Sequence, residues 1–547
     1  MNMQRGLVKP PRPPAAPGGG ASSSPAGDGE SIRWLLAPVV ALAAFMEVLD
    51  ISIANVSLPH IAGDLGASQD ESTWILTSYL VTNAIVLPIS GWLSSVLGRK
   101  RFYMLCITGF AISSMFCGMA PNLDLLILFR AIQGVTGGGL QPVSQAILAD
   151  SFPPRQRGMA FAFYGIAVVF APAIGPTLGG FITDNFSWRW VFLINVPVGV
   201  TLLFLVQAMV HDPAHVLAER LRRLTEGFRM DYLGFGFLAL GLGLLQVVLD
   251  KGEQDDWFSS RLILSCSIVA ALALVAFILW ELERDDPIVD LRLLRNGNFA
   301  VANILMLMLG FVLLGSTVLL PLFVQTLLGY TATEAGMVIS PGGFVIMAMM
   351  PLVGRMVTRV DTRAMIAFGL ITCSFALYKM TVFDLQVDFW TIAITRMIQG
   401  VGLAFLFIPI NSSYSTGLPP EKSGNASAII NLSRNLGGSI GISILTTILS
   451  QRTQYHQALM VKHVNPTNPQ YLSQLASLTQ AMHTQGGTLA AATLRAQGMI
   501  SQMLDQQATL LAYLDDFWFL AVLFVAFVPL VLLMKRTKFD GGPISAH

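Results

Sequence analysis

The sequence predicts an all-α membrane protein with about fourteen transmembrane helices, arranged in groups of six, two and six. Hydrophobic residues make up 54% of the 547 residues and charged residues only 12%, whereas soluble domains carry about 25% charged residues. Apolar stretches of about 18 to 26 residues recur along the chain, each long enough to cross a hydrocarbon core of about 30 Å. Between them, basic residues gather in alternate connections. The bilayer is therefore the expected solvent.

The predicted spans run from residue 34, after an N-terminal tail, to residue 534, before the last polar residues. They are 34–59, 72–94, 102–120, 123–149, 158–183, 188–210, 232–249, 261–281, 300–320, 335–357, 363–382, 389–412, 424–449 and 517–534.

These spans divide the chain into five parts. Residues 1–32 are rich in Pro, Gly, Ala and Ser and predict a disordered cytoplasmic tail. The others are a first six-helix bundle (33–210), a cytoplasmic linker with two extra transmembrane helices (211–298), a second six-helix bundle with a periplasmic loop at 450–516 (299–534), and a cytoplasmic tail (535–547).

Basic residues decide the predicted orientation. They occupy alternate connections on one side, which the positive-inside rule makes cytoplasmic, and both termini fall on that side. The residues are Arg99, Lys100, Arg101, Arg155, Arg157, Arg220, Arg222, Arg223, Arg229, Arg292, Arg295, Arg355, Arg359, Arg363, Lys422, Lys535, Arg536 and Lys538.

Composition also excludes several classes of function. A net charge of +1 gives no basic excess for nucleic acid. The four cysteines lie apart in apolar segments, which argues against a thiolate metal site. No phosphate-binding loop is present, so we expect no cofactor, and a gradient rather than ATP hydrolysis as the energy source. The chain reads as a transporter and not as an enzyme.

An internal repeat relates the two six-helix groups. Six residues of the first group recur 266 positions later: Arg130, Gln133, Gly134, Pro153, Pro154 and Gly158 match Arg396, Gln399, Gly400, Pro419, Pro420 and Gly424. Others recur after 263 positions: Leu65, Gly66, Pro88 and Gly91 match Leu328, Gly329, Pro351 and Gly354. Two parallel six-helix repeats, with substrate bound between them, are typical of major facilitator transporters.

The run GWLSSVLGRKR at residues 91–101 is similar to the loop motif between helices two and three of that family. Gly91, Gly98 and Arg99 match it, but Ser95 and Val96 replace the usual Asp-Arg pair. The resemblance implies a cytoplasmic latch whose acid is missing. The alternative is that the arginines only set topology.

The run APAIGPTLGG at residues 171–180 resembles the helix-five motif of antiporters in this superfamily. Gly175, Gly179 and Gly180 permit close helix approach and Pro176 loosens the helix, which predicts a packed hinge where the halves meet. An ordinary tight helix crossing is the plainer alternative.

With FMEVLDISIANVSLP at residues 45–59 and SWRWVFLINVPVG at 187–199, the chain resembles Emr-type multidrug permeases, which are fourteen-helix drug:proton antiporters. The resemblance implies export of small hydrophobic drugs from the bacterial inner membrane. It also implies two partners, a periplasmic membrane fusion (adaptor) protein and a TolC-like outer-membrane channel. The polar 450–516 loop, predicted to be partly helical, is the candidate for adaptor docking, or else a simple cap over the transporter mouth.

Few ionisable residues lie inside the predicted spans, and such residues are functional candidates because burying charge in lipid is costly. Asp50 lies about nine residues, or about 14 Å, from the end of its helix, and Arg130 lies at a similar depth. Glu47 projects from much the same face as Asp50. We expect Asp50, assisted by Glu47 and opposed by Arg130, to bind the coupling proton; a permanent ion pair is the alternative. At the 263 offset Leu313 replaces Asp50 in the second half.

Polar residues inside other spans are candidates for the substrate cavity: Gln141, Gln145, Gln325, Asn411 and Arg434. Arg434 could meet an anionic substrate, orient a coupling carboxylate or form a structural salt bridge. A transporter of a specific metabolite or siderophore, and a membrane sensor, are the alternative functions. The antiporter-like run favours export.

Overall fold

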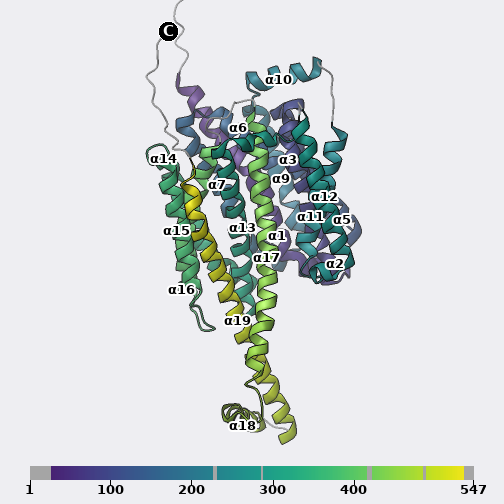
Figure 1. The fold of residues 1–547 in the computed structure, drawn as a ribbon. Helices are drawn as coiled ribbons and strands as arrows, with labels where there is room; N and C mark the ends of the chain where they lie inside the picture. Colours follow the sequence, from purple (N-terminus) through teal and green to yellow (C-terminus); the bar gives the residue numbers. More distant parts are fainter. Residues whose placement is uncertain (1–25, 226–230, 285–286, 415–421, 485–487, 535–547) are drawn as a thin grey trace, which may run out of the picture.

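The structure, a computed structural model, describes residues 26–225, 231–284, 287–414, 422–484 and 488–534. Within those ranges the chain forms helices and no strand. Figure 1 shows the helices gathered in one bundle, from which a pair of long helices projects at one end.

The first group of helices forms the N-terminal half of the bundle. Its members are α1 (Ala26–Leu65), α2 (Gln69–Ser72), α3 (Trp74–Leu97), α4 (Arg99–Gly118), α5 (Leu123–Gly137), α6 (Leu140–Ser151), α7 (Pro154–Asn185), α8 (Arg189–Leu193) and α9 (Asn195–Met209). Helix α1 begins at Ala26, inside the stretch predicted as a tail (1–32). Residues 1–25 of that stretch lie outside the described part of the chain, so the tail remains a prediction.

A central group follows, made of α10 (Ala214–Thr225), α11 (Tyr232–Lys251), η1 (Trp257–Ser259), α12 (Arg261–Glu283) and η2 (Leu291–Arg295). The C-terminal half then contains α13 (Gly297–Thr326), α14 (Ala332–Met356), α15 (Thr362–Met380), α16 (Phe389–Tyr414), α17 (Ser423–Val461), α18 (Pro469–Thr484) and α19 (Leu489–Val531).

Each of the fourteen predicted spans lies on these helices. Among the described residues, twelve spans are long and apolar enough to cross a membrane, and α7, taken as a bent pair of segments, makes thirteen. Helix α17 is not among them, because its sequence is rich in Ser, Asn, Gly and Gln. The count of fourteen therefore remains a prediction.

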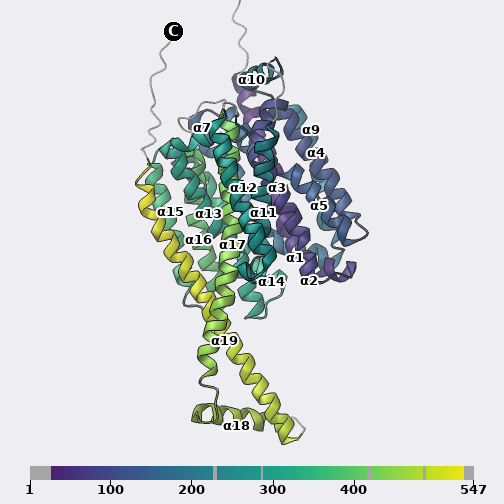
Figure 2. The ribbon, with the colours of Figure 1, turned by 45° about the vertical axis from the view of Figure 1, so that its right-hand side comes forward.

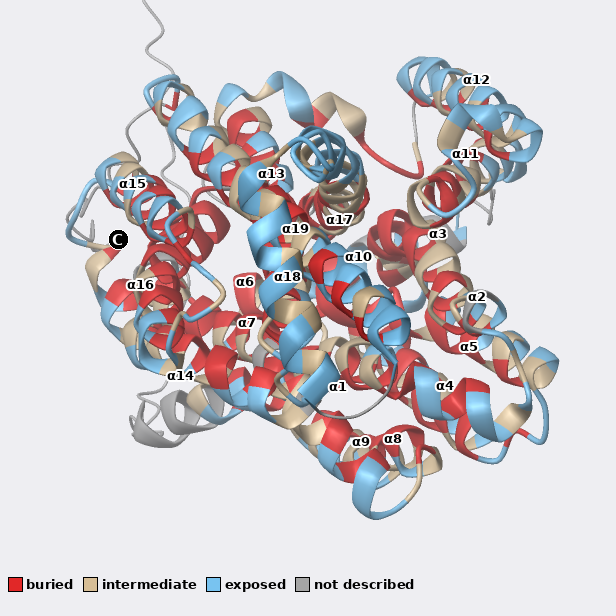
Figure 3. Ribbon diagram, turned by 90° about the horizontal axis from the view of Figure 1, so that it is seen from below, coloured by how far each residue is buried: buried red, intermediate tan, exposed pale blue. Residues whose placement is uncertain are grey.

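The outer surface of the bundle is apolar, as expected for contact with lipid. Figure 3 shows buried faces turned inward and exposed faces turned outward, most clearly on α12. On that helix Leu272 is 67% exposed and Leu279 is 61% exposed. Exposed leucines at two-turn spacing would be costly in water and are favourable in hydrocarbon.

The two ends of the bundle differ in character. Helix α10, which carries Arg220 and Arg222, lies across one end, here called the basic side (Figure 1). At the other end, the hairpin side, α17 and α19 continue beyond the bundle and α18 lies across their tips (Figure 2). The predicted partly helical 450–516 loop is therefore a helical hairpin, because α17 extends to Val461 and α19 starts at Leu489.

Helix starts on the hairpin side repeat between the halves. Gly66 and Gly329 both adopt positive φ, at 66° and 70°, a conformation that favours glycine. Shortly after them, Ser68 and Glu71 form a capping box at α2, and Thr331 and Glu334 form one at α14. The same sequence devices thus end one helix and start the next in each half.

The halves meet at two matching glycine crossings on the basic side. A Cβ added at Gly91 of α3 would lie 2.8 Å from the carbonyl carbon of Gly424 of α17. One added at Gly158 of α7 would lie 2.7 Å from the carbonyl oxygen of Gly354 of α14. These glycines are repeat partners, so the backbone contacts obey the internal symmetry, and larger residues would push the halves apart.

Candidate functional site

A buried ion pair joins α1 to α5 in the N-terminal half. Oδ2 of Asp50 accepts a hydrogen bond from Nη1 of Arg130 at 2.6 Å, and both side chains are 0% exposed. The sequence placed these residues at similar depth, and the fold brings their side chains into contact. An unpaired charge at this depth would be costly, so each side chain depends on the other.

Two further side chains donate hydrogen bonds to Asp50. Oδ1 accepts from Nε2 of Gln133 at 3.1 Å and from Nδ2 of Asn195, at the start of α9, at 2.7 Å. The carboxylate thus receives three side-chain donors, an arrangement that stabilises its charged form. The sequence pattern gave neither donor a role in the site, although Gln133 belongs to the repeat and Asn195 lies in the 187–199 run.

Arg130 is held on several sides. Its Nε donates to the carbonyl oxygen of Ile75 at 3.2 Å, and its Nη1 also donates to Gln133 at 2.8 Å. Its guanidinium carbon lies 4.4 Å from the centre of the Tyr79 ring, within the range of a cation–π contact. Because the planar guanidinium is held by several hydrogen bonds, it fixes the position of the Asp50 carboxylate.

Glu47 lies one turn before Asp50 and is much less well satisfied. It is 1% exposed, and its Oε1 accepts a hydrogen bond from Nδ2 of Asn83 at 3.0 Å. Its Oε2 has no hydrogen-bond partner among the described residues. The amide of Gln141 and the charge of Arg434 also interact with this carboxylate, and Arg434 belongs to the opposite half. Glu47 therefore lies between the Asp50 pair and the opposite half.

Polar side chains from both halves meet at the middle of the bundle. We call this set the central cluster: Gln141, Gln145, Tyr164, Asn411, Asn431 and Arg434.

Hydrogen bonds cross between the halves in the central cluster. Gln145 of α6 donates to Asn411 of α16 at 3.2 Å and accepts from Asn431 of α17 at 2.7 Å. Arg434 donates to the side-chain oxygen of Gln141. Gln145 and Asn411 are 266 positions apart, so the repeat places them as partners on either side of the symmetry axis. Separating the halves must break these bonds or replace them.

The central cluster has an aromatic border. The rings of Tyr164 and Phe407 stack with centroids 6.1 Å apart.

Of the five predicted cavity residues, Gln325 is the one that lies outside the central cluster. It is exposed on α13, and its amide donates to the backbone of Pro321 at 3.2 Å. Its position does not support the predicted cavity role, because it lies on the exposed face of α13 while the neighbouring Phe323 and Val324 are buried.

The C-terminal half contains a matching arginine without an acid. Nη1 of Arg396 donates to Oγ of Ser316 at 3.1 Å and to Gln399 at 2.6 Å. Gln399 also donates to Ser316 at 3.2 Å. The prediction that Leu313 replaces Asp50 is wrong, because the 266 offset applies here rather than 263. Ser316 matches Asp50, and Leu313 matches Glu47.

In the loop motif of residues 91–101, on the basic side, Arg99 is paired with an acid from another helix. Arg99 is ion-paired with Asp150 at the end of α6 and donates to Ser423 at the start of α17 at 2.8 Å. Asp150 therefore stands in for the missing motif acid, and the contact to Ser423 crosses between the halves. Gly98 has φ +86°, which favours glycine, and it caps α3 directly before Arg99.

The glycines of the antiporter-like run pack inside the N-terminal half. A Cβ on Gly179 would lie 3.2 Å from Cα of Ile53 in α1, and one on Gly175 would collide with Ser52. The predicted packing is present, but these glycines face α1 rather than the other half. In the same stretch, Pro176 is inside α7 and Gly180 is buried. Thr177, on another face, contacts Gly336 of α14 and so reaches across.

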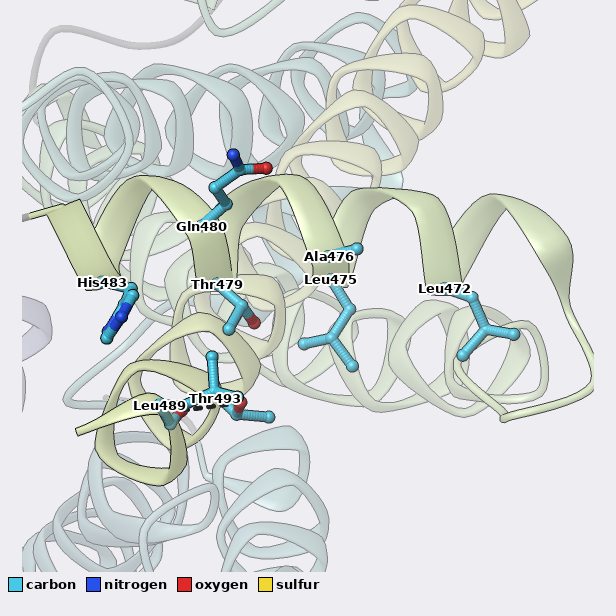
Figure 4. Close-up of a pocket in the computed structure, with 8 residues that line it drawn as sticks. All are labelled: Leu472, Leu475, Ala476, Thr479, Gln480, His483, Leu489 and Thr493. Carbon is cyan, nitrogen blue, oxygen red and sulfur yellow. Dashed lines mark hydrogen bonds between the residues drawn. The ribbon is translucent and has the colours of Figure 1, made fainter.

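An apolar groove lies on the hairpin, far from these buried residues. Figure 4 shows Leu475, Thr479 and His483 of α18 pointing toward Leu489 and Thr493 of α19. Leu472 is 47% exposed and Leu489 is 62% exposed. Exposed apolar residues outside the bundle suggest a protein contact.

Residues 40–442 match the description Major Facilitator Superfamily. The chain belongs to this superfamily. The multidrug export protein EmrB of Escherichia coli K12 is 38% identical over 504 residues, covering 92% of the chain and 95% of that protein. The fatty acid resistance protein FarB of Neisseria gonorrhoeae is 35% identical over 514 residues, covering 94% and 98%. The predicted resemblance to Emr-type permeases is confirmed.

Solved structures share the fold at low sequence identity. The proton:xylose symporter XylE is 15% identical, with a TM-score of 0.57 over 93% of the chain and 97% of that structure. The predicted major facilitator fold is confirmed, and with it a multi-pass protein of a bacterial inner membrane.

Proposed function

We propose that the chain exports hydrophobic or amphiphilic toxic compounds in exchange for protons, by alternating access between its two halves. The single observation that carries the proposal is the Asp50–Arg130 ion pair, a carboxylate and a guanidinium buried together in the half that carries the antiporter-like run. The similarity to a protein named for multidrug export supports the substrate class.

The proton step is expected at Asp50. As an anion it accepts hydrogen bonds from Arg130, Gln133 and Asn195, which tie α1 to α5 and α9. A proton removes the charge that these donors stabilise, so the contacts weaken and α1 is freed to move. Glu47 has one oxygen without a hydrogen-bond partner among the described residues, and it lies between Asp50 and the pair Gln141 and Arg434. We expect it to transmit the loss of charge at Asp50 to those two residues.

The substrate step is expected in the central cluster. Its amides and Arg434 now bond across the interface between the halves. A ligand entering there would replace those bonds, and the Tyr164 and Phe407 rings offer it apolar contact. Loading a drug and opening the interface would thus be one event.

Positive-inside orientation puts the basic side in the cytoplasm and the hairpin in the periplasm. The hairpin groove between α18 and α19 is then the expected site for an adaptor protein, which would lead drugs to a TolC-like outer-membrane channel. This partnership follows from the Emr resemblance together with the projecting shape of the hairpin (Figure 2).

The proposal is tested by proton release. Purified protein in lightly buffered detergent solution is mixed with hydrophobic antibiotics or a fluorescent amphiphilic dye, and the pH is followed with an indicator. Drug binding should release protons from wild type and not from Asp50→Asn. Binding of drug without proton release in wild type would exclude proton exchange. Proton release by a specific metabolite or siderophore, and by none of the drugs, would favour the specific-transporter alternative.

A further inference from the structure

A second buried carboxylate, Asp516 of α19, has no part in the proposed exchange site. Its side chain is 0% exposed, and neither carboxylate oxygen has a hydrogen-bond partner among the described residues. It lies on α19 (Leu489–Val531) in the C-terminal half, and α19 is one of the two long helices that form the hairpin (Figure 2).

Aromatic residues flank Asp516 on α19. Tyr513, one turn earlier, and the following Phe517 both contact the Phe323 ring of α13, with ring centroids 5.4 Å and 6.2 Å apart. Phe517 also contacts Phe383, at 6.4 Å. Such an environment offers little solvation to a negative charge.

The nearby cation is already engaged. Arg452 of α17 pairs with the neighbouring Asp515 at 2.9 Å, and His456 of α17 lies 2.8 Å from the same carboxylate. On α15, Lys379 is exposed and lies over the Phe375 ring. On α13, Thr326 interacts with the Tyr513 hydroxyl. No charged group of these packed helices is bonded to Asp516 in the part of the chain that the structure describes.

Asp50 and Asp516 are therefore opposites. Asp50 accepts hydrogen bonds from an arginine and two amides, whereas neither oxygen of Asp516 accepts a hydrogen bond among the described residues. A buried carboxyl without donors is stable only as the neutral acid, since ionisation would leave an uncompensated charge.

We propose that Asp516 is a second proton-binding site, occupied by a proton in this conformation, and that Asp515 and His456 connect it to the hairpin-side surface. Asp515 is 31% exposed and His456 is 17% exposed, so the pair contacts solvent while adjoining the buried acid. Rearrangement of α17 against α19 would bring Asp516 to this pair and let it exchange its proton. The proposal does not rest on the proposed drug exchange.

Infrared spectroscopy of the full-length protein in lipid nanodiscs tests it, because a protonated carboxylic acid has a carbonyl stretch that a carboxylate lacks. The difference spectrum of wild type minus Asp516→Asn at neutral pH should show this band. Wild type minus Asp515→Asn, the matched control, should lack it and show loss of carboxylate absorption instead. A carboxylate band in the Asp516 difference spectrum would overturn the proposal.

A second variant guards against misfolding. Asp516→Leu has similar size and suits aromatic surroundings, so it should fold and lose the same carbonyl band. If Asp516 is instead charged and paired in the native protein, the leucine variant will lose carboxylate absorption only, and the proposal fails. Neither spectrum depends on transport activity, so a failure here is distinct from a failure of drug:proton exchange.

Discussion

Each half of the molecule contains a buried arginine and a buried glutamine that donate hydrogen bonds to one central residue. We call this arrangement the polar frame, and its central residue differs between the halves. In the first, Arg130 and Gln133 bond to Asp50, at separations of 80 and 83 residues. In the second, Arg396 and Gln399 bond to Ser316 at the same separations. Only the first half places an acid inside the frame.

This difference separates scaffold from chemistry. The arginine and glutamine recur because both halves need the same helix-to-helix hydrogen bonds, whether the acceptor is a carboxylate or a hydroxyl. A serine hydroxyl does not titrate in the physiological range, so the second frame holds a fixed structure. If the first frame binds the coupling proton, the halves divide the work, one sensing protons and the other serving as its rigid counterpart.

The largest expected effect comes from removing the acid. Asp50→Asn keeps the size and can still accept a hydrogen bond from Arg130, but it cannot exchange a proton. Drug export by vesicles with an imposed pH gradient should fall to the background of vesicles without the protein, while expression is retained. Ser316→Ala, the matched change in the other half, should retain most activity. Wild-type rates in Asp50→Asn would eliminate this residue as an essential coupling acid.

A smaller effect is expected from exchanging the two arginines for lysine. Arg130→Lys loses the planar fork that reaches Asp50, Gln133 and the Ile75 carbonyl together. Hydrogen bonds to charged groups are worth about 1.5–3 kcal/mol each, so export should slow by at least about tenfold. Arg396 donates hydrogen bonds only to neutral groups, so Arg396→Lys should slow export by less than about threefold. Equal losses in both variants would break the proposed division of work.

The third test gives the second half an acid. Ser316→Asp places a carboxylate within reach of Arg396 and Gln399, so the variant should fold with a melting temperature close to that of wild type. Ser316→Asp combined with Arg396→Met should be strongly destabilised, because breaking a buried pair costs about 3–5 kcal/mol. Melting can be followed by tryptophan fluorescence. If the single and double variants melt alike, the two frames are not equivalent in geometry.

The smallest effect is expected at the capping boxes of α2 and α14, which occur in both halves. The backbone N–H and hydroxyl of Ser68 donate to Glu71 and hold its pKa below the ordinary value of 4.5. A lowered carboxyl pKa stabilises the fold above the unfolded-state pKa, and this stabilisation disappears as pH falls through the lower folded-state value. Glu71→Gln should lower the melting temperature by about 1 °C or less at neutral pH.

The matched change Glu334→Gln should have an effect of similar size at neutral pH, since Thr331 and Glu334 repeat the same capping box. The difference between wild type and Glu71→Gln should vanish when the pH is lowered below the carboxyl range. A difference that persists in acid would assign it to packing instead of charge.

The sequence by itself determined the class of fold and much of its internal symmetry. Long apolar runs require helices in lipid because backbone groups there must bond within the segment. The recurrence of Arg130 and Gln133 as Arg396 and Gln399 already implied matching frames. The depth of Asp50 and Arg130 could be counted along their helices, because an α-helix rises by a constant amount for each residue.

Only the tertiary structure decided which side chains meet. Asn195, Asp150 and Ser316 lie on helices whose rotation and depth depend on packing between distant segments, which no local pattern encodes. Three extra residues in the hairpin-side end of α1 switch the repeat offset from 266 to 263, so counting alone gave Leu313 in place of Ser316. The contrast between Asp50 with its donors and Asp516 without them arises in the same way, because the solvation of a buried carboxyl is set by neighbours brought together in space.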